Sequence, residues 1–246
     1  MKQEKEMIAM LFAAGLGTRL KPFTDKHPKA LAMVNGKTLL QHNIEYLQQF
    51  NIRKVVVNVH HFPQQIINII NENKGWGSEV FISDETEEVL ETGGGLKKAE
   101  HFFKGYENIL VMNVDMLTNL DINKMLLFHI TKNVLATLAV TERNTSRYFL
   151  FNTQQKLCGW MNNTTKQVRG VEQFDEAKHQ PLAFSGIQIM QSKLISLINQ
   201  TGKFSLVDVY LDLLKANTIL AYNHSKDKLI DVGKPESIVI AETMFK

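Results

Sequence analysis

The sequence predicts an α/β fold in which a mainly parallel, mixed β-sheet is flanked by helices. Three observations support this class. Strand and helix patterns alternate along the first half of the chain, the expected strands are apolar on both faces, and the helical stretches carry apolar side chains mainly on one side. Strands that are apolar on both faces are typical of a parallel sheet, because helices cover both of its sides. The expected arrangement is Rossmann-like.

The first half of the chain contains most of the regular pattern. A first buried strand is expected at Met7–Phe12, and the β-branched run at Lys54–Val59 predicts a second. Further strands are expected over residues 80–83 and 109–113. Helices are expected over residues 38–50, from Pro63 onward, and over residues 94–103, where a triple glycine opens the helix.

The second half is less regular. Its expected strands cover residues 135–140, 182–190, 219–222 and 229–231, and its expected helices cover residues 122–130, 193–199, 206–216 and 235–244. Between them, the polar stretch from residue 148 to residue 184 contains hairpin-like runs on either side of Asn162-Asn163-Thr164, which marks a turn. No linker divides the chain, so one domain is expected over residues 1–246.

Composition excludes several classes of protein. The net charge is only +3 and the basic residues are spread along the chain, whereas a nucleic-acid-binding protein usually carries a basic block or stripe. The single cysteine, Cys158, excludes an intrachain disulfide framework and fits a reducing compartment. The apolar run near the N-terminus is too short for a signal sequence or a membrane span. We therefore expect a cytoplasmic protein without a membrane or nucleic-acid partner.

The loop after the first strand carries the main functional signal. Gly15 and Gly17 are followed by the hydroxyl of Thr18 and by two cations, Arg19 and Lys29. Glycines let backbone N–H groups approach anionic oxygens closely, and the cations neutralise charge. This loop is therefore suited to wrapping a triphosphate.

Two other glycine-loop motifs do not fit. A dinucleotide fingerprint needs a third glycine at position 20, which is Leu20, and an acid near the end of the second strand, where the chain reads Asn58-Val59-His60. Gly36-Lys37-Thr38 suggests a phosphate-binding Walker loop, but the first glycine of that motif would fall at Leu31.

The longer string Gly15-x-Gly17-Thr18-Arg19-Leu20-x-Pro22-x-Thr24, followed by Pro28-Lys29-Ala30, resembles the signature of the sugar-phosphate nucleotidyltransferases, or nucleotide-sugar pyrophosphorylases. The resemblance implies the nucleotide-diphospho-sugar transferase fold, with a nucleotide-binding half at residues 1–115 and a sugar-phosphate-binding half at residues 116–246. It also implies that the loop, including Ala13 and Ala14, wraps a nucleoside triphosphate whose phosphates contact Arg19 and Lys29. The need for cations is physical, because two unit charges about 4 Å apart repel by about 4 kcal/mol at an effective dielectric of about 20.

The same resemblance implies a divalent metal, Mg²⁺, held by two aspartates. Asp115 follows the apolar strand that ends in Val111-Met112-Asn113-Val114, at the edge where open α/β sheets bind their ligands. It resembles the metal aspartate of the family, although the family usually has a glycine in place of Val114. Asp231, in Asp231-Val232-Gly233-Lys234-Pro235-Glu236, resembles the second metal aspartate.

Two further strings point to a branch of the family. Leu90-Glu91-Thr92-Gly93-Gly94-Gly95 looks most like the N-acetylmuramate-1-phosphate uridylyltransferases, and the resemblance implies nucleotide contacts from this region, namely Asp84, Glu85, Thr92, Gly93 and Gly94. Phe184-Ser185-Gly186-Ile187 also resembles that branch, at a position where the family binds the sugar. Ser185 and Gly186 are therefore candidate sugar-phosphate residues. Asn113, near the metal aspartate, is another, and so is Arg147, whose guanidinium could grip the sugar phosphate in a fork. The usual Glu-Lys-Pro acceptor motif is not recognisable.

The resemblance thus implies a magnesium-dependent enzyme that condenses a nucleoside triphosphate, UTP first, with a sugar 1-phosphate, to give a nucleotide-sugar precursor of cell wall or polysaccharide and pyrophosphate. GTP with a mannose- or heptose-like 1-phosphate is the second pair. A non-catalytic module that binds nucleotide sugars is the rival class, but such a module would be expected to lose Arg19, Lys29 or a metal aspartate.

Overall fold

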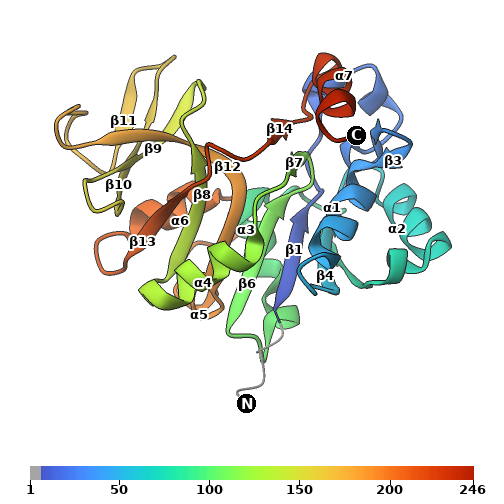
Figure 1. Ribbon diagram of the computed structural model, residues 1–246. Helices are drawn as coiled ribbons and strands as arrows, with labels where there is room; N and C mark the ends of the chain where they lie inside the picture. Colours follow the sequence, from blue (N-terminus) through green and yellow to red (C-terminus); the bar gives the residue numbers. More distant parts are fainter. Residues whose placement is uncertain (1–6) are drawn as a thin grey trace.

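A ten-stranded mixed sheet forms the centre of the molecule in the computed structural model, which describes residues 7–246 (Figure 1). The first six residues of the expected domain lie outside the described residues. In the first half of the chain, β1 (Ile8–Phe12), β4 (Lys54–Val59), β5 (Glu79–Asp84) and β6 (Asn108–Asn113) run parallel in the order β5-β4-β1-β6. The loops that leave their carboxyl ends therefore meet at one edge of the sheet.

The strands of the second half extend the same sheet with mostly antiparallel pairs. The long strand β12 (Gln180–Gln191) lies antiparallel to β6, to β8 (Ala136–Thr141) and to β9 (Arg147–Phe151), and β13 (Ile219–Asn223) lies parallel to β8. The hairpin expected around Asn162 joins β10 (Leu157–Asn162) to β11 (Gln167–Arg169). The expected α/β class with a mixed sheet is confirmed.

Helices cover both faces of the sheet, as the apolar strands require. On one face, α1, α2 and α4 pack against β1, β4 and β6, and on the other face α3, α5 and α6 do so. Their bounds are α1 Leu39–Gln48, α2 Pro63–Glu72, α3 Glu91–Lys98, α4 Ile122–Lys132, α5 Lys193–Ser196 and α6 Leu206–Leu213. Among residues 7–246, no helix has both the length and the apolar character of a bilayer span.

Within the described residues 7–246, two short ladders and five 3-10 turns accompany the central sheet and its helices. The ladders pair β2 (Met33–Val34) with β3 (Lys37–Thr38), and β7 (Met116–Thr118) with β14 (Leu229–Asp231). The turns are η1 Thr18–Leu20, η2 Phe23–Asp25, η3 Lys29–Leu31, η4 Lys74–Gly77 and η5 Ala99–Phe103. The last helix, α7 (Pro235–Met244), closes a small core with residues of the first loop; Figure 1 shows it at the top of the molecule, and it contacts β2 and β14.

The helix expected over residues 94–103 is wrong at its start and in its continuity. The helix α3 begins at Glu91, and the 3-10 helix η5 follows it. The triple glycine therefore lies inside the helix and is buried. The N–H groups of Gly93 and Gly94 donate to the carbonyl oxygen of Phe204, at 2.9 and 3.2 Å. A Cβ on Gly93 would lie 2.4 Å from the Phe204 ring, so glycine here permits close packing and does not expose free N–H groups.

Candidate active site

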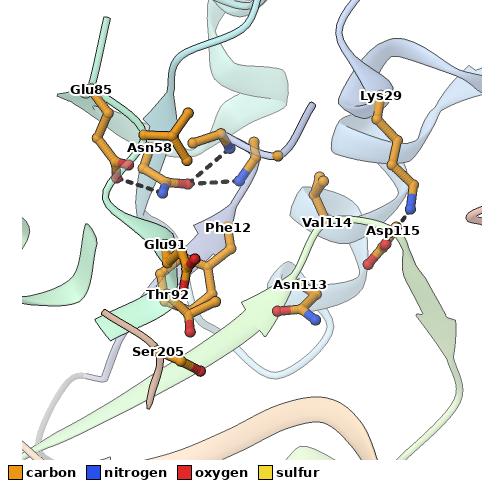
Figure 2. A pocket seen from close by; sticks show the side chains of 14 residues that line it. Phe12, Lys29, Asn58, Glu85, Glu91, Thr92, Asn113, Val114, Asp115 and Ser205 are labelled. Atoms are coloured by element: carbon orange, nitrogen blue, oxygen red, sulfur yellow. Dashed lines mark hydrogen bonds and ion pairs between the residues drawn. The ribbon is translucent and has the colours of Figure 1, made fainter. Parts of the chain in front are cut away.

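A cavity of about 360 Å³ opens where β1, β4, β5 and β6 end. Its position is the one that strand direction dictates, because the loops after parallel strands meet at this edge. The lining residues are Phe12, Ala13, Ala14, Gly15, Lys29, Asn58, Glu85, Val89, Glu91, Thr92, Asn113, Val114, Asp115 and Ser205 (Figure 2). The first loop, the region after β5 and the Asp115 loop are thus brought together around one space.

One wall of the cavity is built on a buried amide. The side-chain oxygen of Asn58 accepts hydrogen bonds from the backbone N–H groups of Ala13, at 2.7 Å, and Ala14, at 3.3 Å. Its nitrogen donates to Glu85 Oε1 at 2.7 Å, and Glu85 Oε2 accepts from the N–H of Leu90 at 3.2 Å. Burial raises the pKa of the Glu85 carboxyl, and the hydrogen bonds from Asn58 and Leu90 oppose part of that rise.

The opposite wall carries Lys29 and Asp115, and Asp231 and Arg19 lie next to them. Figure 2 shows Lys29 pointing at Asp115, across the cavity from Asn58 and Glu85. The ammonium of Lys29 forms an ion pair with Asp115 and lies 3.8 Å from Asp231 Oδ1, while Arg19 lies 3.3 Å from Asp231 Oδ2. Lys29 is 11% exposed, whereas Arg19 is 57% exposed. One buried cation and one exposed cation therefore bracket two aspartates.

The tertiary structure explains how two distant aspartates meet. In the β7–β14 ladder, Asp231 is paired with Met116, the residue after Asp115. The N–H of Val232 donates to the carbonyl oxygen of Asp115 at 2.8 Å, and Asn43 holds the carbonyl of Val114 at 2.8 Å. These backbone contacts hold both carboxylates beside Lys29.

Gly17 gives the first loop its shape. It has a φ of +62°, and a Cβ there would lie 2.8 Å from Thr24 Cγ2 and 3.0 Å from Lys29 Cβ. Thr24 in turn donates its hydroxyl to the Gly17 carbonyl at 3.0 Å. A larger residue at position 17 would push the loop away from Lys29, so glycine at this position allows the loop to pack against the Lys29 side chain.

The donor set at the two aspartates fits Mg²⁺. Both donors are hard carboxylate oxygens, and Asp231 Oδ1 is buried without a hydrogen-bond partner. Within residues 7–246, no three His, Cys, Asp or Glu side chains are grouped to form a complete metal site. Mg²⁺ is commonly bound by one or two carboxylates, with substrate phosphates and water supplying the other ligands. Asp115 and Asp231 are the residues that would hold it.

The residues selected from the sequence for the nucleotide fall into two groups. Ala13, Ala14, Gly15, Lys29, Glu85 and Thr92 line the cavity. The others, Gly17, Thr18, Arg19, Asp84, Gly93 and Gly94, lie outside its lining. Asp84 is exposed and accepts hydrogen bonds from Thr86, Thr18 begins the turn η1, and Gly93 and Gly94 pack under Phe204. The N–H groups of Ala13 and Ala14 already have a partner in Asn58.

On the sugar-phosphate side, Asn113 lines the cavity and Gly186 lies directly against it. Gly186 has a φ of +71°, and a Cβ there would lie 2.8 Å from Asn113 Nδ2. Ser185 is buried, and its hydroxyl lies 2.7 Å from Nε2 of His224. Arg147 is exposed at the start of β9, outside the cavity lining. The structure therefore brings only Asn113 and Gly186 of this group together.

The site residues predicted from the sequence do not include the other lining residues, which are Phe12, Asn58, Val89, Glu91, Val114 and Ser205. Asn58 leaves one usable signal, since it is a single amide in the valine-rich strand Lys54–Val59. Glu91 has a φ of +58°, which is uncommon for a residue other than glycine and leaves no local signal in the sequence.

Comparison with known proteins shows the family of the chain. The family model described as nucleotidyl transferase matches residues 8–245. The N-acetylmuramate alpha-1-phosphate uridylyltransferase of Caulobacter vibrioides is 42% identical over 112 residues, which are 45% of this chain and 46% of that protein. The chain thus spans about half the length of that relative. The mannose-1-phosphate guanyltransferase of Yarrowia lipolytica is 23% identical over 248 residues, 97% of this chain and 64% of that protein.

A solved structure with the same fold is that of HddC from Yersinia pseudotuberculosis in complex with GMP-PN. It has a TM-score of 0.77 and 23% identity, and the match covers 97% of this chain and 99% of that chain. The match to the family model over almost the whole chain, together with the shared fold, shows that this protein belongs to the nucleotidyl transferase family, whose related members are sugar-phosphate nucleotidyltransferases.

Proposed function

We propose that this protein condenses UTP with a sugar 1-phosphate, giving a UDP-sugar and pyrophosphate. The observation that carries the proposal is the placement of Lys29 between Asp115 and Asp231 at the wall of the cavity. A triphosphate in this cavity would meet Lys29 and Asp115 in its lining, with Asp231 and the exposed Arg19 next to them. These are the groups that phosphoryl-type transfer requires for charge neutralisation.

In the proposed reaction an oxygen of the sugar phosphate attacks the α-phosphorus of the nucleoside triphosphate. A new P–O bond forms, the bond between the α-phosphorus and its bridging oxygen breaks, and pyrophosphate leaves with the electron pair. Lys29 and Arg19 neutralise the phosphates and so bring the two anions together. When bound to Asp115 and Asp231, Mg²⁺ supplies further neutralisation at the phosphates. No covalent enzyme intermediate is required.

The choice of UTP rests on relatives. The uridylyltransferase of Caulobacter vibrioides shares 42% identity with this chain over the matched segment, and the Leu90–Gly95 string resembles that branch. An amino-sugar 1-phosphate is therefore the first acceptor to test, in the nucleotide-sugar pathway to a cell-wall or polysaccharide precursor. A guanylyltransferase is the second candidate, because the mannose-1-phosphate guanyltransferase matches 97% of this chain. The cytoplasmic location and the division at residues 115 and 116 stay predictions.

A panel of nucleoside triphosphates and sugar 1-phosphates, read by pyrophosphate release with Mg²⁺, tests the proposal. Turnover with UTP above the other triphosphates is expected. Preference for GTP would favour the second candidate, and no turnover across a broad panel would favour a non-catalytic module that binds nucleotide sugars.

The substitution Asp115→Asn tests the metal assignment. It keeps the size of the side chain but removes a carboxylate ligand, so turnover should be abolished while the far-UV circular dichroism stays that of the wild type. Near-normal turnover would refute the assignment of Asp115 as a metal ligand.

A further inference from the structure

A buried amide in the cavity wall has an orientation that its neighbours determine. Asn58 is 2% exposed and Glu85 is 1% exposed, although both line the cavity. The oxygen of Asn58 faces two N–H groups, those of Ala13 and Ala14, and its nitrogen faces the Glu85 carboxylate. A rotated amide would set N–H against N–H and oxygen against carboxylate. The carboxylate of Glu85 therefore selects the one orientation in which Asn58 accepts from the first loop.

The third glycine of the triple glycine belongs to the same arrangement. A Cβ on Gly95 would lie 2.6 Å from Glu85 Oε1 and 3.1 Å from Asn58 Nδ2. Any side chain at this position would push the carboxylate and the amide apart. Helix α3 thus comes close enough to cover the pair because position 95 is a glycine. Glu85 is also anchored from its own strand and loop, by the N–H of Leu90 on Oε2.

We propose that Asn58 is a positioning residue for the nucleoside triphosphate, with its orientation set by Glu85. Asn58 acts through the backbone. By accepting from two consecutive N–H groups, Asn58 fixes the orientation of the peptide groups at Ala13 and Ala14. These peptide groups determine the direction in which Gly15 and the rest of the loop face the nucleotide. The inference rests on the proposed nucleotidyltransferase function, and it adds a residue that neither the sequence motifs nor the family comparison assigns.

The hydrogen-bond chemistry of this pair permits a test in which the polarity is reversed. In Asn58→Asp two carboxylates would face each other where a 2.7 Å hydrogen bond now lies, so one of them needs a proton. In the double variant Asn58→Asp/Glu85→Gln, the new carboxylate at position 58 would still accept from Ala13 and Ala14. The new amide at position 85 would donate to that carboxylate and accept from the N–H of Leu90. All four hydrogen bonds and the total charge would be restored.

Steady-state kinetics with UTP and GTP, at saturating sugar phosphate and Mg²⁺, would compare the wild type, the two single variants and the double variant. For Asn58→Asp, kcat/KM for the triphosphate should fall about 10- to 100-fold near neutral pH, mainly through KM, because a buried hydrogen bond to a charged group is replaced by repulsion. In a second series, with the sugar phosphate varied at saturating triphosphate, the KM for the sugar phosphate should not change. Glu85→Gln should give a smaller loss.

The pH profile adds a readout that a general loss of stability would not produce. The difference in kcat/KM for the triphosphate between Asn58→Asp and the wild type should become smaller as the pH falls from about 8 to about 6. At the lower pH, one proton shared between the two carboxylates takes the place of the amide donor. Lys98 and His60 are the charged or titratable groups that act on Glu85, and both are unchanged in every variant. Gln188→Glu is a matched control. It also places a carboxylate at a buried amide, one that accepts from Tyr210 at 2.6 Å, so it should lower stability without raising the KM for the triphosphate.

Recovery of kcat/KM in the double variant to within about threefold of the wild type would support the inference, since it measures coupling between the two side chains. A double variant as impaired as Asn58→Asp, or an Asn58→Asp enzyme with the wild-type KM, would overturn it. If Asn58→Asp does not fold, the KM of the double variant for the triphosphate is the test: a value near that of the wild type supports the inference, and a clearly higher value contradicts it. If the wild type has no turnover, the proposed function fails. The inference is then tested by calorimetry, in which the wild type and the double variant should bind UTP or GTP more tightly than Glu85→Gln, and Asn58→Asp should bind most weakly.

Discussion

The substitution Lys29→Met removes the buried cation of the site and keeps most of the volume of its side chain. Lys29 is 11% exposed, pairs with Asp115 and lies 3.8 Å from Asp231. At an effective dielectric of about 20, opposite unit charges about 4 Å apart attract by about 4 kcal/mol. If the ammonium exerts this attraction on the phosphates in the transition state, its loss corresponds to about a 1,000-fold fall in kcat/KM.

The assay is pyrophosphate release with the best substrate pair from the panel. Lys124→Met serves as the control, because Lys124 is 75% exposed and forms a surface ion pair with Asp121 at 3.1 Å. Such pairs contribute only about 0–1 kcal/mol, so this variant should keep the activity of the wild type. A Lys29→Met enzyme within about tenfold of the wild type would refute the assignment of the buried cation to the phosphates.

A second measurement uses the carboxylates that Lys29 now neutralises. Without the ammonium, Asp115 and Asp231 repel each other, and a divalent cation relieves that repulsion. Mg²⁺ should therefore raise the melting temperature of Lys29→Met more than it raises that of the wild type. Equal shifts would contradict the view that the two aspartates form one site.

Two further predictions concern stability. Gly93→Ala should destabilise the protein by about 1–3 kcal/mol in urea titrations, because the new Cβ would lie 2.4 Å from the Phe204 ring. Gly15→Ala is the control, because a Cβ at that position would have no neighbour within 4 Å, and it should change stability by less than about 0.5 kcal/mol. Equal losses in the two variants would contradict the explanation that Gly93 is needed for close packing against Phe204. Burial lowers the pKa of His129 to about 4, and its Nδ1 lies 2.8 Å from Thr137. The pKa of His129 in the folded state lies below its unfolded value of about 6.5, so the neutral, buried imidazole adds to the free energy of unfolding only while the side chain is unprotonated. The full contribution is present above about pH 6.5, and about 1.4 kcal/mol of stability is lost per pH unit as the pH falls toward 4. Between about pH 7 and about pH 5, the free energy of unfolding of His129→Gln in urea titrations should therefore fall less than that of the wild type. If stability depends on pH equally in both proteins, His129 is not the cause of that dependence.

Much of the secondary structure was accessible from local patterns. The valine-rich run is the strand β4 at Lys54–Val59, and the proline-started helices begin at Pro63 and Pro235 as expected. These elements could be predicted because periodicity and the fixed φ of proline act within a few residues. The prediction for the triple glycine is wrong for the opposite reason. Its role depends on Phe204, a residue far along the chain, and a glycine has no side chain whose character reveals its partner.

The candidate site divides in the same way. The sequence by itself determined the α/β class and the family, because these depend on composition, periodicity and a long contiguous motif. The phosphate-binding role of the first loop stays a prediction from the same motif. Only the tertiary structure decided that Asp231 lies beside Asp115, through the β7–β14 ladder, and that Asn58 holds the first loop. The physical reason is that hydrogen bonds and ion pairs depend on distances in space, and chain topology, not separation along the sequence, sets those distances.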